Sequence, residues 1–89
     1  MKTILFAQEL DIQRAIPEPG SMAMGRSDSK NNVLWVNEEL PPEVMQVTLL
    51  HEYLHLLSDI LHLELTEEQV CGISAGLYST GITLPVKEE

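Results

Sequence analysis

The stretch His51-Glu52-Tyr53-Leu54-His55 decides the fold, and it lies in a run from residue 43 to about 61 that we predict to be one helix. Residues four apart on a helix project from one face, so His51 and His55 stand one above the other. Two imidazoles placed in this way suit two corners of a tetrahedral Zn²⁺ site. Glu52 lies beside the first histidine, where it can reach a metal-bound water without being a ligand, as a general base in hydrolysis must.

The alternative interpretation is that these residues fall at this spacing by chance, as core histidines. The rest of the predicted helix argues against it, because a helix that is apolar on two sides is buried between layers. Between its apolar arcs runs a narrow polar stripe of His51, His55, Ser58 and His62, with Glu52 and Asp59 on its shoulder. A buried polar stripe is costly unless its groups are satisfied, and a metal ion with its water would satisfy them.

Composition limits the class of protein. The chain has 89 residues, of which 44% are hydrophobic and 21% are charged, so we expect one small folded domain over residues 1–89. Fourteen Asp and Glu against five Lys and Arg give a net charge of −9, which argues against nucleic-acid and anionic-membrane partners. The single cysteine, Cys71, excludes an intrachain disulfide. The start resembles no signal peptide, so we expect a cytoplasmic protein.

The first half of the chain predicts strands. Residues 3–8 form a short apolar run with β-branched residues, which Ala15 and Ile16 could extend. The segment from Asn32 to Asn37 is the strongest strand pattern, and we expect it to pair with residues 22–25 as a hairpin across a polar turn. We expect Trp35 to be a core or half-buried anchor rather than a ligand-stacking residue.

A second helix is predicted to begin at Thr66-Glu67-Glu68-Gln69, a capping box with Thr66 at the cap. It extends to about residue 77 or 78, and its apolar stripe is Val70, Ile73, Ser74 and Leu77. Gly72 and Gly76 on another flank fit either close packing or simple tolerance in a weak helix. Residues 82–86 are expected to be an extended tail, which could lie in a cleft as an inhibitor.

A catalytic zinc needs a third protein ligand. Downstream candidates are His62, Glu64, Glu67, Glu68 and Cys71. His62 lies nearly three turns beyond His51, too far along the helix to bind the same ion. The helical period turns Glu67 toward the packed side and Glu68 toward solvent. Two alternatives stay open: Glu67 could only complement the helix dipole, and Cys71 could be a buried small residue or the ligand of a His-His-Cys site.

The motif from His51 to His55, followed by Glu67 on the next helix, resembles the gluzincin type of zinc metallopeptidase. The short chain is similar to the minigluzincins and to small proteins encoded by phages and mobile elements, and residues 25–37, 48–52 and 65–78 share their order and spacing. The resemblance implies an α+β fold: a small antiparallel sheet of about three strands packed on an active-site helix and a following glutamate helix. It implies one Zn²⁺ held by His51, His55 and Glu67, with Glu52 as the general base. It also makes the strand from Asn32 to Asn37 the edge on which a protein or peptide substrate would add.

The chain departs from that family in two ways. It has no room for the second lobe that places a His or Tyr over the developing oxyanion, and Tyr78, Tyr53 and His62 are the substitutes we consider. Gluzincins often carry an acid one turn after the glutamate ligand, and here that position is Cys71, which leaves Asp59 as a candidate acceptor for His55. We therefore expect a zinc metallopeptidase, active or latent. The alternatives are a non-catalytic metal-binding regulatory or peptide-binding module and a structural zinc domain, and the oligomeric state is open.

Overall fold

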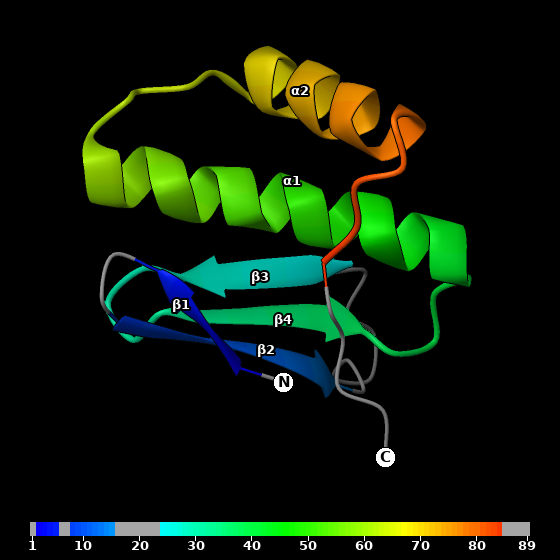
Figure 1. Cartoon of the computed structure of the whole chain (residues 1–89), viewed down its shortest axis with the longest axis horizontal. Helices are drawn as coiled ribbons and strands as arrows, with labels where there is room; N and C mark the ends of the chain where they lie inside the picture. Colours follow the sequence, from blue (N-terminus) through cyan, green and yellow to red (C-terminus); the bar gives the residue numbers. More distant parts are fainter. Residues whose placement is uncertain (1, 6–7, 16–23, 85–89) are drawn as a thin grey trace.

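The computed structural model describes residues 2–5, 8–15 and 24–84, with no side chains before Leu10 or at Ala15. The elements in chain order are β1 (Lys2–Leu5), β2 (Gln8–Ala15), β3 (Gly25–Asp28), β4 (Val33–Asn37), α1 (Pro42–Leu61) and α2 (Glu67–Ser79). They stack as three layers, with the sheet on one side of α1 and α2 on the other (Figure 1). The expected α+β fold, a small sheet packed on helices, is confirmed.

The sheet is mixed rather than antiparallel throughout. Its described strands run in the order β1-β2-β4-β3, with β1 and β3 antiparallel to their neighbours. The inner pair, β2 and β4, is parallel, with Asp11 opposite Val33 and Ala15 opposite Asn37. The predicted single strand over residues 3–8 is therefore two strands. The sequence pattern did not predict β2, because most of its residues are polar. Among its described side chains, only Leu10 and Ile12 are buried.

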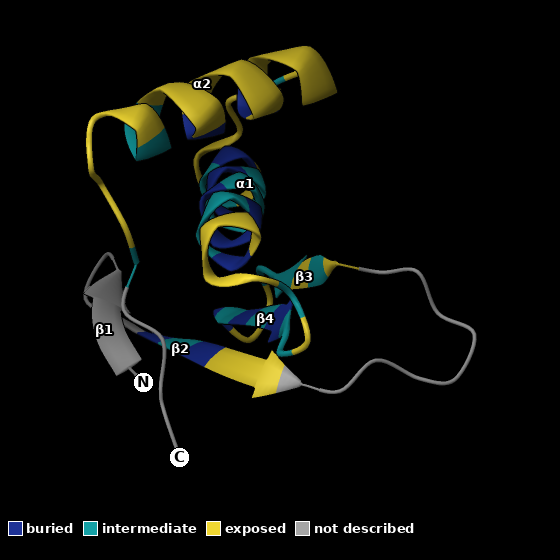
Figure 2. Cartoon of the chain, turned by 90° about the vertical axis from the view of Figure 1, so that its right-hand side faces the viewer, coloured by how far each residue is buried: buried dark blue, intermediate teal, exposed yellow. Residues whose placement is uncertain are grey.

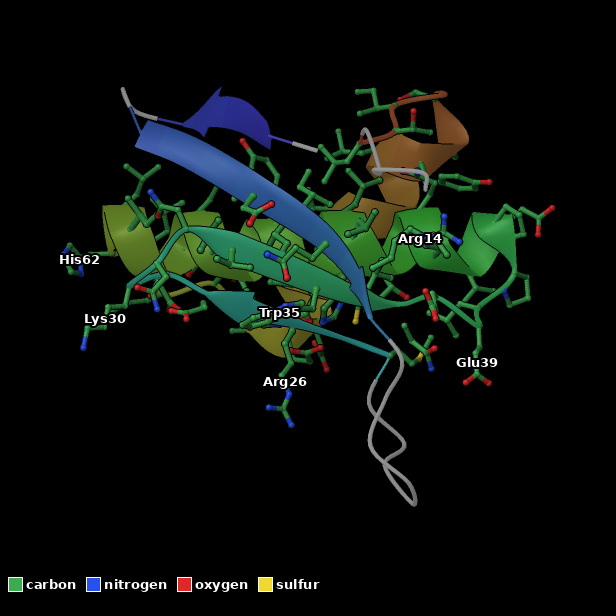
Figure 3. All side chains as sticks on the ribbon, turned by 90° about the horizontal axis from the view of Figure 1, so that it is seen from below. Arg14, Arg26, Lys30, Trp35, Glu39 and His62 are labelled. Carbon is green, nitrogen blue, oxygen red and sulfur yellow. The ribbon has the colours of Figure 1, made fainter. Side chains whose placement is uncertain are left out.

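The predicted strand from Asn32 to Asn37 is confirmed as β4, but its predicted position at the edge of the sheet is wrong. β4 lies between β2 and β3, because the hairpin places β3 on its far side and leaves β3 at the open edge. Leu34 and Val36 are buried on the face toward α1. Trp35 is half-buried on the opposite face, where its Nε1 donates to Oε1 of Gln13 at 2.8 Å (Figure 3).

The predicted hairpin is present, with its first strand shifted along the chain. β3 occupies Gly25–Asp28, so Arg26, Ser27 and Asp28, which we expected in the turn, belong to the strand. Of the predicted segment, residues 22 and 23 lie outside the described residues. Met24 contributes its carbonyl oxygen to the pairing, as the acceptor of Asn37 N–H at 2.8 Å. Strand pairing thus overrides the polar composition of the segment.

Helix α1 is confirmed as the buried central helix. It begins with Pro42 in its first turn and ends at His62, which adopts a left-handed conformation and donates its backbone N–H to Ser58 O. Met45, Leu49 and Leu56 join the strand residues in the core. Leu50 and Leu54 are also buried, so α1 is covered on two sides (Figure 2). No helix in the described part of the chain is long and apolar enough to cross a membrane.

Helix α2 packs only on α1 among the described helices and strands. The predicted capping box is present: Thr66 Oγ1 accepts from Gln69 N–H, and Gln69 Oε1 accepts from Thr66 N–H. Only Val70 and Ser74 of α2 are buried, so the predicted apolar stripe is narrower than expected, and Ile73 is exposed. A β-carbon at Gly72 or Gly76 would meet no atom within 4 Å, so the close-packing interpretation of these glycines is wrong.

The chain after α2 crosses back over α1 (Figure 1). Gln46 on α1 donates Nε2–H to Leu84 O at 3.0 Å and accepts Leu84 N–H on Oε1 at 2.9 Å. The Leu84 side chain packs against the core. Gln46 projects about 140° around the helix from His51. Residues 82–84 therefore do not cover the histidine face, and residues 85 and 86 of the predicted tail lie outside the described residues.

Candidate metal centre

Two helices bring three metal-binding side chains together. His51 and His55 come from successive turns of α1, and Glu67 is the first residue of α2. Glu67 Oε1 lies 2.7 Å from His51 Nε2, and its Oε2 lies 3.0 Å from His55 Nε2. The two Nε2 atoms are 3.1 Å apart. Together these residues form a group that could hold one metal ion.

The connection between the helices sets the position of Glu67. Ser58 O accepts Leu63 N–H at 3.0 Å, and the Ser58 hydroxyl oxygen accepts Leu65 N–H at 3.0 Å. His62 and Glu64 both adopt positive φ angles, which tighten the reversal. Thr66 then caps α2, so Glu67, the first residue of that helix, is held close to the two histidines by a short connection.

The donor atoms fit the requirements of zinc. A tetrahedral Zn²⁺ with ligands at about 2.0–2.1 Å separates them from one another by roughly 3.4 Å. The separations of 2.7, 3.0 and 3.1 Å are a few tenths shorter, so small side-chain movements would admit the ion. Two imidazoles and one carboxylate are also a donor set that zinc uses.

Glu52 lies beside this group without belonging to it. It is half-buried, and the loss of hydration raises the pKa of its carboxyl group. Positive charge on His55 or His51 lowers that pKa, whereas the Glu67 carboxylate raises it. A carboxyl group with a raised pKa next to a metal-binding group is what a general base requires.

Cys71 occupies the position one turn after Glu67. Its Sγ lies 3.8 Å from His51 Nδ1 and 3.8 Å from Glu67 Oε1. The thiol is exposed, but neighbouring protein atoms displace part of its hydration and, together with Glu67, raise its pKa. The interpretation of Cys71 as a buried small residue is wrong. Because the thiol lies on the Nδ1 side of His51, the geometry favours Glu67 over Cys71 as the third donor.

The other candidate residues lie outside the group. Glu68 and Asp59 are both exposed. Among the described side chains, Asp59 makes no hydrogen bond to His55, and neither residue belongs to the metal-binding group. His62 is the C-cap residue at the end of α1 (Figure 3). The helical rise places it about 10 Å along the axis from His55. Tyr78 lies about 16 Å along α2 from Glu67. Tyr53 packs against the core.

Two neighbours of Glu52 were not predicted as part of the site. Gly25 and Thr48 lie against it, from β3 and from the previous turn of α1. The only sequence signal was a glycine at the end of an apolar segment, which gives no indication of its partner.

No protein-family model matches the chain, and neither a curated protein nor a solved structure matches it.

Proposed function

We propose that the protein is a zinc-dependent peptidase of the gluzincin type, with His51, His55 and Glu67 as metal ligands. The observation that carries the proposal is the convergence of the three side chains within hydrogen-bonding distance, with half-buried Glu52 beside them. A structural zinc domain would close all four coordination positions, whereas the described part of the chain contributes three ligands to this group.

The chain's own residues would divide the reaction between them. Bound zinc would supply Lewis acidity and would lower the pKa of a bound water to about 7. Glu52 would accept the proton of the attacking water at its carboxylate and would then deliver that proton to the leaving amine of the cleaved peptide bond. The raised pKa of Glu52 supports the first transfer, because it brings the pKa of the carboxyl group closer to that of the water.

We also propose that an extended peptide substrate docks on β3, the edge strand, in place of the predicted docking on β4. The bond from Asn37 N–H to Met24 O marks a hydrogen-bonded pair between β3 and β4. Because such pairs alternate in an antiparallel ladder, the backbone groups of Gly25 and Ser27 point to the open edge. A peptide added there would run along the flank of α1 that carries Glu52.

The test compares four proteins: wild type, Glu52→Gln, Glu67→Ala and the matched control Glu68→Ala. Metal content is measured by elemental analysis, and cleavage is followed with dye-labelled casein. We expect wild type and Glu68→Ala to bind zinc and cleave, and Glu67→Ala to lose zinc. Glu52→Gln should keep zinc and retain only a small residual rate of cleavage. Unchanged cleavage by Glu52→Gln would refute the role of Glu52.

A second candidate function is a metal-binding regulatory or peptide-binding module without turnover. Cys71 beside His51 favours it, since a thiol is a weaker hydrogen-bond acceptor than the carboxylate expected there. The distances of Tyr78 and His62 from the site favour it as well. Zinc binding by every protein that retains the three ligands, with no cleavage by any of them, would support this function.

A further inference from the structure

Gly25 at the start of β3 lies directly against α1. A β-carbon at this position would lie 2.8 Å from Trp35 O, 2.9 Å from Thr48 Cγ2 and 3.2 Å from Glu52 Cγ. The first two distances are too short for any real side chain, so another residue would force its neighbours to move.

Glycine is required at position 25 because there is no room for a β-carbon, and not because of its backbone conformation. Among the described glycines only Gly81 has a positive φ, so an L-residue could adopt the backbone conformation of Gly25. Gly76 provides the contrast, because a β-carbon there would meet nothing within 4 Å. The tight position is thus specific to the contact between β3 and α1.

The contact falls on the stem of Glu52. Thr48 and Glu52 lie one turn apart on α1, about 40° from each other around the helix, on the flank next to His55. Thr48 is buried and Glu52 half-buried. Because the carboxylate continues from Cγ, an atom that displaces Cγ also displaces the carboxylate.

We propose that Gly25 is a positioning residue for Glu52. The bare backbone of β3 packs beside the Glu52 side chain and, together with Thr48, confines its carboxylate to the side that faces the two histidines. The proposal rests on the function proposed above, in which Glu52 transfers the proton. In this proposal the edge strand β3 has two roles: it positions the Glu52 carboxylate and it binds the peptide substrate.

The first test is a double-mutant cycle on the zinc-loaded chain with Gly25→Ala, Glu52→Gln and the double variant. We expect Gly25→Ala to keep zinc and to lower kcat for labelled casein by about 100-fold. In the Glu52→Gln background it should cause no further loss, since the effect acts through Glu52. The control Gly76→Ala should leave zinc binding and kcat unchanged. Additive losses, or full kcat in Gly25→Ala, would overturn the proposal.

The second test needs no substitution and no activity. In the zinc-free wild-type protein, NMR should detect close contacts between the Gly25 α-protons and the Glu52 γ-protons, with one Glu52 rotamer. Several averaging rotamers would overturn the positioning role. If wild type binds no zinc and cleaves nothing, the proposed function fails, and the NMR result still decides whether Gly25 holds Glu52.

Discussion

At the scale of single residues, Asp28 closes the turn between β3 and β4. Its Oδ1 accepts Lys30 N–H at 3.0 Å and Asn31 N–H at 3.2 Å, and its Oδ2 accepts Asn31 Nδ2–H at 2.8 Å. These bonds favour the ionised form, and the Asn31 side chain contributes most, so the pKa of Asp28 lies below its ordinary value of 3.8. The turn holds the register that places Gly25 opposite Val36.

A pH-dependent contribution to stability follows. A lowered pKa stabilises the folded state at pH values above the unfolded value, and this stabilisation is lost as pH falls through the folded value. We expect Asp28→Asn to lower Tm at neutral pH, because the amide that replaces the carboxylate accepts hydrogen bonds without carrying a charge. The difference in Tm from wild type should shrink below about pH 4. Thermal unfolding from about pH 2 to 7 measures it, and a constant difference would contradict the assignment.

The sequence predicted His51, His55 and Glu67 because helical periodicity and a capping box fix their directions locally. It did not predict Gly25 beside Glu52, and it left the place of the Cys71 thiol beside His51 as one of two alternatives. Both depend on how two separate elements approach each other, and no local pattern encodes that distance.

At the scale of elements, the connection between α1 and α2 depends on Ser58. This residue is buried, and its hydroxyl oxygen accepts Leu65 N–H shortly before Glu67. Ser58→Ala would leave that partly buried N–H without its acceptor. We expect a loss of stability of about 1–3 kcal/mol. Zinc affinity should fall too, because the start of α2 becomes less fixed.

The matched control is Ser79→Ala at the exposed end of α2, where the hydroxyl donates to Gly76 O. Urea unfolding and competition with a zinc chelator compare the two variants. Equal behaviour of the two would show that Ser58 does not hold the connection.

The segment after α2 is fastened by Gln46 through both atoms of its side-chain amide. We expect Gln46→Leu to release Leu84 and to destabilise the chain by about 1–2 kcal/mol, because two hydrogen bonds are lost. Hydrogen exchange at Leu84 N–H should become faster, while exchange at Val70 N–H within α2 should change little. Unchanged exchange at Leu84 would exclude this anchoring role.

Elements with a strong local signal were predicted within a residue or two. Both helices and β4 belong to this class. β2 and β3 do not, because their polar residues form strands only through pairing with β4. The parallel pair and the inner position of β4 are likewise properties of the assembled sheet, which a hairpin pattern alone does not reveal.

At the scale of the whole molecule, the candidate metal centre joins the outermost layer to the rest. α2 buries only Val70 and Ser74, so a metal shared with α1 would add substantially to its attachment. Free zinc at about 100 times Kd would stabilise the fold by about 2.7 kcal/mol. For a chain of this size that corresponds to a rise in Tm of roughly 10–20 °C.

Scanning calorimetry with zinc and with a chelator measures this rise. The Glu67→Ala variant serves as the control and should show a much smaller response. An equal rise in both proteins would place the zinc elsewhere.

The confinement of α2 to α1 also has a consequence for the order of folding. The candidate ligands lie within residues 51–67 and meet through one helical hairpin. In contrast, β2 and β4 are neighbours in the sheet but are separated in the sequence by β3. Contacts between neighbours in sequence form faster than those that close long loops. The histidines and Glu67 are therefore expected to meet before the sheet is complete, and early zinc capture would then bias the collapsing chain toward its native arrangement.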